Sequence, residues 1–109
     1  MDYRELLESA ARAAGYGELR ILEDSSIIVN SRRWNPLADD GDAMRLAIRL
    51  GIGISFFMNE SYTGENNVVR ARHFDFGEIE EHADDNGGID AATRRAIVRA
   101  AAAMAKTIA

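Results

Sequence analysis

Apolar residues recur three and four positions apart in three segments of the chain, which is the spacing of amphipathic helices. The pattern predicts helices over residues 2–14, about 40–50 and 90–108, and an aspartate stands at or next to the start of each. Gly15 and Gly51 directly follow the first two segments and are expected to end them. Three helices are therefore expected, of which the last is long and rich in alanine.

The apolar positions of the later helices predict which of their faces are buried. The second helix is expected to bury Ala43, Leu46, Ala47 and Leu50, with Met44 and Ile48 widening that face. The last helix is expected to bury Ile97, Ala101, Met104 and Ile108. Its many alanines permit close packing, either against its own sheet or at the seam of a homodimer.

Alternating and β-rich runs predict two hairpins. The first joins residues 18–23 to residues 27–31 through the polar turn Asp24-Ser25-Ser26. In the second, the strand 52–59 is followed by a polar loop and by a partner strand at 68–74. Its apolar alternation places Ile52, Ile54, Phe56 and Met58 on one side of the strand.

The acidic stretch 75–85 is expected to contain a short helix, because Asp75 and Glu78 stand in capping-box register. The order of elements predicts one α+β domain over residues 1–109, with two layers. Each hairpin needs further strands beside it, so we expect the two to join in one antiparallel sheet of about four strands. The long alanine-rich C-terminal helix is expected to pack on that sheet with the other helices.

Composition narrows the class of protein. The chain has 109 residues and no cysteine, which excludes disulfides, a thiol nucleophile and cysteine-based metal sites. Its first residues are polar, and no apolar run approaches the ~18 residues that cross a bilayer. We therefore expect a soluble, cytoplasmic protein with no membrane partner.

Charge is distributed unevenly along the chain. Residues 75–90 hold seven acidic groups and no basic one, whereas residues 91–109 hold four basic groups and no acidic one. The two segments are expected to balance each other, either within one chain or between chains. The net charge of −5 argues against sequence-independent binding of nucleic acid.

Two His-x-Asp pairs, His73/Asp75 and His82/Asp84, could contribute to a metal site, but their spacing fits no compact metal-binding signature. Residues 82–93 also lack the first carboxylate and the final glutamate of a calcium-binding loop. A solvated acidic connector explains the histidine pairs better, and a glycine-rich turn followed by a capped helix explains residues 82–93. No metal, cofactor or catalytic residue is predicted, and the chain is expected not to be an enzyme.

The densest motif is Trp34-Asn35-Pro36-Leu37-Ala38-Asp39-Asp40-Gly41-Asp42-Ala43-Met44-Arg45-Leu46-Ala47. It resembles a Trp-Asn-Pro-Leu-x-Asp-Asp-Gly-Asp-Ala-x-Arg-Leu-Ala block in a family of small tailed-bacteriophage and prophage proteins with no established function. Residues 10–15 and 93–101 are similar to the ends of the same proteins. The resemblance implies a phage or prophage origin and a bacterial host, and it assigns no catalytic residue.

This block has two interpretations. Its carboxylates outnumber what one helix cap requires, and tryptophan is enriched at binding hot spots, which predicts an interaction patch. The patch would comprise Trp34, Asn35, Asp39, Asp40, Asp42 and Arg45. In the structural alternative, Trp34 fills the core, Asp40 caps the helix, and Arg45 pairs with Asp42.

The function expected from these observations is that of a non-enzymatic phage or prophage accessory protein. It would act by protein–protein interaction with an unidentified phage or host protein, with a homodimer as a further possibility. The alternative is a nucleic-acid-binding accessory protein in phage replication or regulation. That alternative requires the arginine clusters at 32–33, 70–72 and 94–99 to converge on one face.

Overall fold

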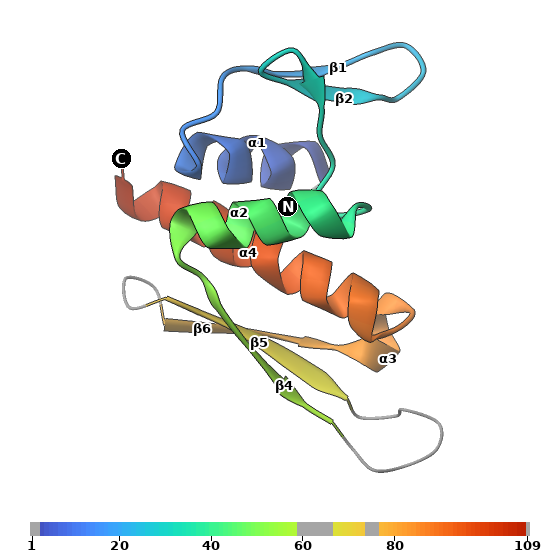
Figure 1. Cartoon of the computed structure of the whole chain (residues 1–109), viewed down its shortest axis with the longest axis vertical. Coiled ribbons are helices and arrows are strands. Elements are labelled where there is room, and N and C mark those ends of the chain that lie inside the picture. The colour runs from blue at the N-terminus through green and yellow to red at the C-terminus, as the bar shows by residue number, and fades with distance from the viewer. Residues whose placement is uncertain (1–2, 59–66, 74–76, 109) are drawn as a thin grey trace.

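The computed structural model describes residues 3–58, 67–73 and 77–108 (Figure 1). The helices in these ranges are α1 (Tyr3–Ala13), α2 (Asp40–Leu50), α3 (Ala83–Asn86) and α4 (Ile89–Ile108). The strands are β1 (Leu19–Ile21), β2 (Ile27–Val29), β3 (Arg32–Arg33), β4 (Gly53–Phe57), β5 (Val68–His73) and β6 (Gly77–His82). The chain is therefore an α+β domain, as predicted. No helix within the described ranges is both long and apolar enough to cross a membrane.

Helix α4 is the central element of the fold. Helices α1 and α2 contact it on one side, and α3 with strands β5 and β6 contacts it on the other (Figure 1). Its alanines allow these neighbours to approach closely, because a methyl group adds little to the distance between packed backbones. The buried alanines are Ala92, Ala96, Ala100, Ala101, Ala102 and Ala105. They pack against elements of the same chain.

The predicted helices are confirmed, with small differences at their ends. Gly15 and Gly51 follow α1 and α2 with φ angles of 75° and 69°, the left-handed conformation that glycine adopts without strain. In α4 the expected core positions Ile97, Ala101 and Met104 are buried. The expected cap at residue 2 and the side chain at position 108 lie outside the described residues.

The strands form two sheets, not the single four-stranded sheet that the sequence predicts. Both are antiparallel and three-stranded, in the orders β1-β2-β3 and β4-β5-β6. They lie at opposite ends of the molecule with the helices between them (Figure 1). Each predicted hairpin is confirmed at β1–β2 and β4–β5, and each gains its third strand from the segment that follows it. Residues 59–66, which are the end of the predicted strand and most of the predicted second loop, lie outside the described residues.

Strand β3 follows a two-residue turn that the sequence pattern does not predict. Asn30 and Ser31 both have positive φ, 53° and 64°, as the two central residues of a type I′ hairpin turn require. The usual signal for this turn is a glycine, which is missing here. Residues 32–33 therefore read as a connector although they pair with β2.

Strand β6 replaces most of the short helix that the acidic stretch predicts. Only residues 83–86 are helical, and residues 77–82 pair with β5. Glu78 and Glu80 lie opposite Arg72 and Arg70, with Nε to Oε1 distances of 3.1 and 2.9 Å. These cross-strand ion pairs favour a strand because opposite charges directly across a sheet attract each other. Residues 74–76 lie outside the described residues.

The turn before β3 generates a stability prediction. Ser31→Gly is expected to raise the free energy of unfolding by about 0.5 kcal/mol. Glycine adopts positive φ without strain, and the greater entropy of glycine in the unfolded chain offsets only part of this stabilisation. Ser9→Gly, inside α1, is the matched control and should lower it by a few tenths of a kcal/mol, the difference between the helix propensities of serine and glycine. Urea denaturation measures both, and a destabilised Ser31→Gly would contradict the turn assignment.

Candidate functional site

Trp34 is part of the core. Its side chain is 7% exposed, and its ring meets Tyr16 edge to face with centroids 5.9 Å apart. The nearby Pro36 is fully buried. The guanidinium of Arg49 lies 5.3 Å from the Tyr16 ring centroid, on the same aromatic pair. Trp34 therefore presents little surface to a partner and anchors the connector between β3 and α2.

Asp39 and Asp42 build the start of α2. Asp39 is the N-cap, and its carboxylate accepts a hydrogen bond from the backbone N–H of Asp42 at 2.7 Å. Asp42 accepts from the backbone N–H of Asn35 at 2.9 Å and from Arg45 Nη2 at 2.7 Å. The hydrogen bond with Asp42 raises the pKa of Arg45. The capping role thus falls to Asp39, and the predicted pairing of Arg45 with Asp42 is confirmed.

Asp40 does not cap the helix but connects it to α4. Its carboxylate pairs with Arg94 Nη1 at 2.6 Å, and Arg94 Nε donates to the backbone carbonyl of Leu37 at 3.0 Å. These contacts join the connector, the first turn of α2 and the first half of α4. All three carboxylates of the block therefore have structural partners, although Asp39, Asp40 and Arg45 remain exposed.

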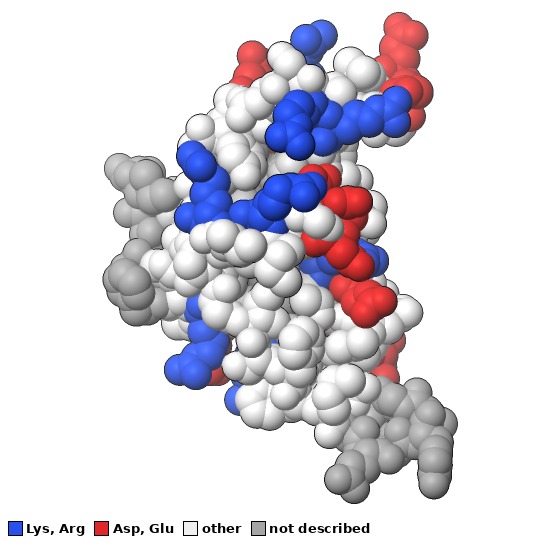
Figure 2. All heavy atoms as spheres, in the orientation of Figure 1, with Lys and Arg blue, Asp and Glu red and all other residues white. Residues whose placement is uncertain are grey.

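Charged side chains gather around this block. Figure 2 shows arginines above α2 and carboxylates beside its first turn, on the upper half of the visible face. A hollow of about 100 Å³ lies among them, lined by Tyr16, Val29, Asn30, Arg32, Arg33, Trp34, Asp42 and Arg45. This hollow is smaller than the roughly 300–1,000 Å³ typical of small-molecule sites. A more open hollow of about 430 Å³ adjoins it over Asp39, Asp42 and Arg45.

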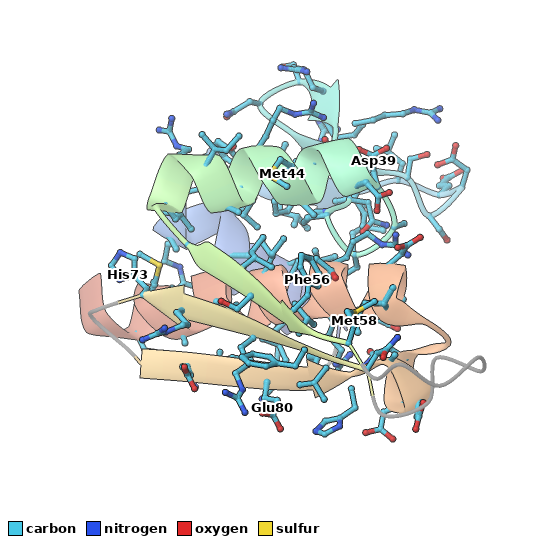
Figure 3. All side chains as sticks on the ribbon, turned by 60° about the horizontal axis from the view of Figure 1, so that its bottom comes forward. Asp39, Met44, Phe56, Met58, His73 and Glu80 are labelled. Carbon is cyan, nitrogen blue, oxygen red and sulfur yellow. The ribbon has the colours of Figure 1, made fainter. Side chains whose placement is uncertain are left out.

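An uncharged surface lies below the block, and sequence reasoning missed it (Figure 2). On α2, Met44 and Ile48 are 49% and 72% exposed, although helical spacing predicts that they widen the buried face. Phe56 and Met58, in and after β4, are 53% and 56% exposed. Figure 3 shows Met44, Phe56 and Met58 on one side of the molecule. We call these four residues the α2–β4 surface.

A groove connects the two halves of the α2–β4 surface. Its volume is about 270 Å³, and its lining is predominantly apolar. Met44 and Ala43 of α2, Phe56 of β4, and Ile89 and Ile97 of α4 contribute the apolar side chains. Asp40, Asp90, Thr93 and Arg94 complete the lining. The sequence signal was the excess of apolar positions on α2, which cover more of its circumference than one buried stripe needs.

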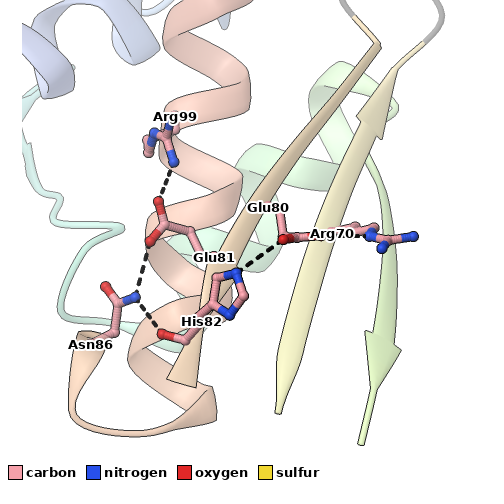
Figure 4. A network of polar contacts seen from close by, with 6 residues as sticks. All are labelled: Arg70, Glu80, Glu81, His82, Asn86 and Arg99. Carbon is pink, nitrogen blue, oxygen red and sulfur yellow. Dashed lines mark hydrogen bonds and ion pairs between the residues drawn. The ribbon is translucent and has the colours of Figure 1, made fainter. Parts of the chain in front are cut away.

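The acidic and basic segments meet within the chain, at Glu81 (Figure 4). Glu81 is 8% exposed and accepts hydrogen bonds from Arg99 Nη1 and, at 3.0 Å, from Asn86 Nδ2. Arg95 Nε lies 3.4 Å from the same carboxylate. At this contact the acidic segment 75–90 and the basic segment 91–109 pair within one chain, which is one of the two alternatives that the sequence left open.

The two predicted His-x-Asp pairs do not come together as a metal site in the described residues. His82 lies on the outer face of β6, where its ring contacts Glu80 at 2.9 Å. Arg70 also pairs with Glu80, and these two hydrogen bonds lower the pKa of the Glu80 carboxyl. Residue 75 lies outside the described residues. Among the residues that the structure describes, no group of three potential metal ligands is found.

The three arginine clusters lie on different elements. Arg32 and Arg33 are on the upper sheet, whereas Arg70 and Arg72 are on the lower one (Figure 1). The cluster at 94–99 is on α4, and its arginines pair with Asp40 and Glu81. The convergence that nucleic-acid binding would require is not found in the described part of the chain.

The chain matches no model of a known protein family, and comparisons with curated proteins and with solved structures also find no similar protein.

The capping geometry yields a testable difference between two neighbouring aspartates. Asp39→Ala is expected to lower the free energy of unfolding by about 1 kcal/mol, because the N–H group of Asp42 loses its partner. Asp39→Asn should retain most of the stability, since asparagine also caps helices. Asp40→Ala, which removes only an exposed ion pair, should cost less. Urea denaturation measures all three, and a larger loss for Asp40→Ala would contradict the assignment.

Two adjacent glutamates test the network in Figure 4. Glu81→Ala should lower the free energy of unfolding by about 2–3 kcal/mol, because it leaves Arg99 and Asn86 without their acceptor in a partly buried site. Glu80→Ala is the matched control on the solvent face of the same strand and should have a much smaller effect. Equal losses in thermal or urea denaturation would show that Glu81 is not a structural centre.

Proposed function

We propose that this chain is a non-enzymatic accessory protein of phage or prophage type that acts by protein–protein contact through the α2–β4 surface. The observation that carries the proposal is that Met44 and Phe56 line one apolar groove and, like Ile48 of the same helix and Met58 directly after the same strand, are about half exposed or more. Large apolar side chains in contact with water favour burial by about 25 cal/mol per Å². A partner that covers this surface gains that free energy.

A shared apolar groove distinguishes Met44 and Phe56 of this surface from the other exposed apolar residues. Ile21 and Leu22 are 43% and 40% exposed on the upper sheet, and Tyr3 is 67% exposed on α1. Single exposed apolar residues are common, whereas contiguous apolar patches mark interaction sites. Phenylalanine and methionine are also enriched in protein interfaces, and methionine adapts its shape to different partners.

The motif at residues 34–47, which carries the phage resemblance, holds in place the helix from which Met44 and Ile48 project. Asp39 caps α2, Asp42 holds the connector, and Asp40 fixes the helix to Arg94 of α4. These contacts set the position from which Met44 and Ile48 project. In this proposal the block orients the interaction helix, and its own polar side chains are not the principal contact.

Site-specific cross-linking tests the proposal. A photoreactive amino acid at position 48 is expected to form covalent adducts with protein in bacteria that carry a related phage or prophage. The same group at position 21, which is also exposed but lies on the opposite sheet, is the matched control and should form few. Mass spectrometry identifies the adducts. Absence of adducts at position 48, or equal yields at both positions, would refute the proposal.

A further inference from the structure

We infer that the occupant of the α2–β4 surface is a second copy of this chain, whose β4 pairs antiparallel with β4 around a twofold axis at Ser55. The inference rests on the proposed function, because it assumes that the α2–β4 surface makes a protein contact. It adds the partner, the pairing register and the symmetry.

One edge of strand β4 pairs with no other strand in the described part of the chain. Strand β4 is an outer strand of its sheet, bonded only to β5 among the described strands. Its sequence, Gly-Ile-Ser-Phe-Phe, contains neither a charge nor a proline. The opposite edge strand, β6, carries Glu78 and Glu80 on its solvent face. Charges and prolines discourage edge pairing in natural sheets, so β6 is protected and β4 is not.

The side chains of β4 complement one another when two copies pair at Ser55. Ile54 and Phe56 share the face that points toward the helices, and in this register Ile54 of each copy lies opposite Phe56 of the other. Pairs of β-branched and aromatic residues stabilise antiparallel strands. On the outer face, Phe57 of each copy lies opposite Gly53 of the other, where an aromatic ring can cover the glycine. No charge faces a like charge.

The added strand would also cover α2. A strand that pairs with β4 lies about 4.8 Å beyond it, on the side left open by β5. The groove lined by Met44 and Phe56 shows that this edge of the sheet adjoins α2. The apolar face of the second β4 would thus meet the exposed methionine and isoleucine of this helix. Because the contact is isologous, the same burial occurs twice.

Charge on α2 is compatible with this symmetry. Its first turn is acidic, with Asp40 and Asp42, and its last turn carries Arg49. A twofold axis reverses the part of each helix direction that is perpendicular to the axis, so two α2 helices that run along the sheet surface are antiparallel across it. In that orientation the two helix dipoles oppose each other, whereas Arg49 itself is directed at Ala14 and Tyr16 of its own chain.

The absence of cysteine makes the register directly testable by single-cysteine variants of the full chain. Ser55→Cys should form a disulfide-linked dimer on mild oxidation, since opposed residues of antiparallel strands have Cα atoms about 4.5–5.5 Å apart. Gly53→Cys and Phe57→Cys should link to each other when mixed, but only slowly when alone. A Cβ at Gly53 meets no atom closer than 3.8 Å. Ser26→Cys, on the opposite sheet, is the matched control.

Sedimentation of the purified chain supplies the second measurement. The native chain should sediment with twice the 12.0 kDa mass of one copy. Phe56→Lys should raise the dissociation constant tenfold or more without changing the circular dichroism spectrum, because the side chain is already 53% exposed. A native chain that stays monomeric at millimolar concentration, with the Ser55→Cys variant linking no faster than the Ser26→Cys variant, would overturn the inference.

The two proposals fail in different ways. If the purified chain is monomeric while position 48 forms adducts with another protein, the second-copy inference is refuted and the proposed function stands. If position 48 forms no adducts and the purified chain is monomeric, both are refuted. Adducts whose mass is that of two copies, together with the 53–57 linkage, support both.

Discussion

Close packing around α4 is the constraint on which the rest of the structure depends. A helix lined with alanine can approach α1 and α2 on one side and the lower sheet on the other. Two polar contacts accompany this packing, the exposed pair of Asp40 with Arg94 toward α2 and the buried acceptor Glu81 with Arg99 toward β6. Because α4 underlies β5 and β6 more than β4, the outer strand extends beyond the helix. The apolar residues of β4 and of the outer side of α2 therefore remain exposed.

Local patterns predict the elements of this fold better than their assembly. Helical spacing and glycine stops give α1, α2 and α4, and alternation gives both hairpins. The third strands follow from features without a strong local signal, a positive-φ turn at Asn30-Ser31 and charge pairing between β5 and β6. The separation into two sheets depends on which strands meet across the helices, and no short-range pattern encodes that. The contact of Asp40 with Arg94 likewise joins residues 54 positions apart.

The candidate site shows a similar division. The six residues of the predicted patch do lie together, but their hydrogen bonds explain most of the unusual chemistry as helix construction. Tryptophan is typical of interfaces only where its ring is accessible, and Trp34 is buried against Tyr16. Helical spacing predicts that Met44 and Ile48 are buried, because it records only that apolar residues share a face of the helix. It does not show how far the sheet and α4 extend under that face. Exposure, which only the tertiary structure supplies, moves the proposed contact from the block to the α2–β4 surface.

Amide hydrogen exchange along β4, followed as a function of protein concentration, tests the pairing of two copies most directly. Exchange of the β4 amides should slow as concentration rises, because pairing with a second copy protects the N–H groups on the open edge of the strand. Amides in the interior of α4 should exchange slowly at every concentration. Rapid exchange of the outward-facing β4 amides at all concentrations would contradict the claim that a second copy occupies this edge.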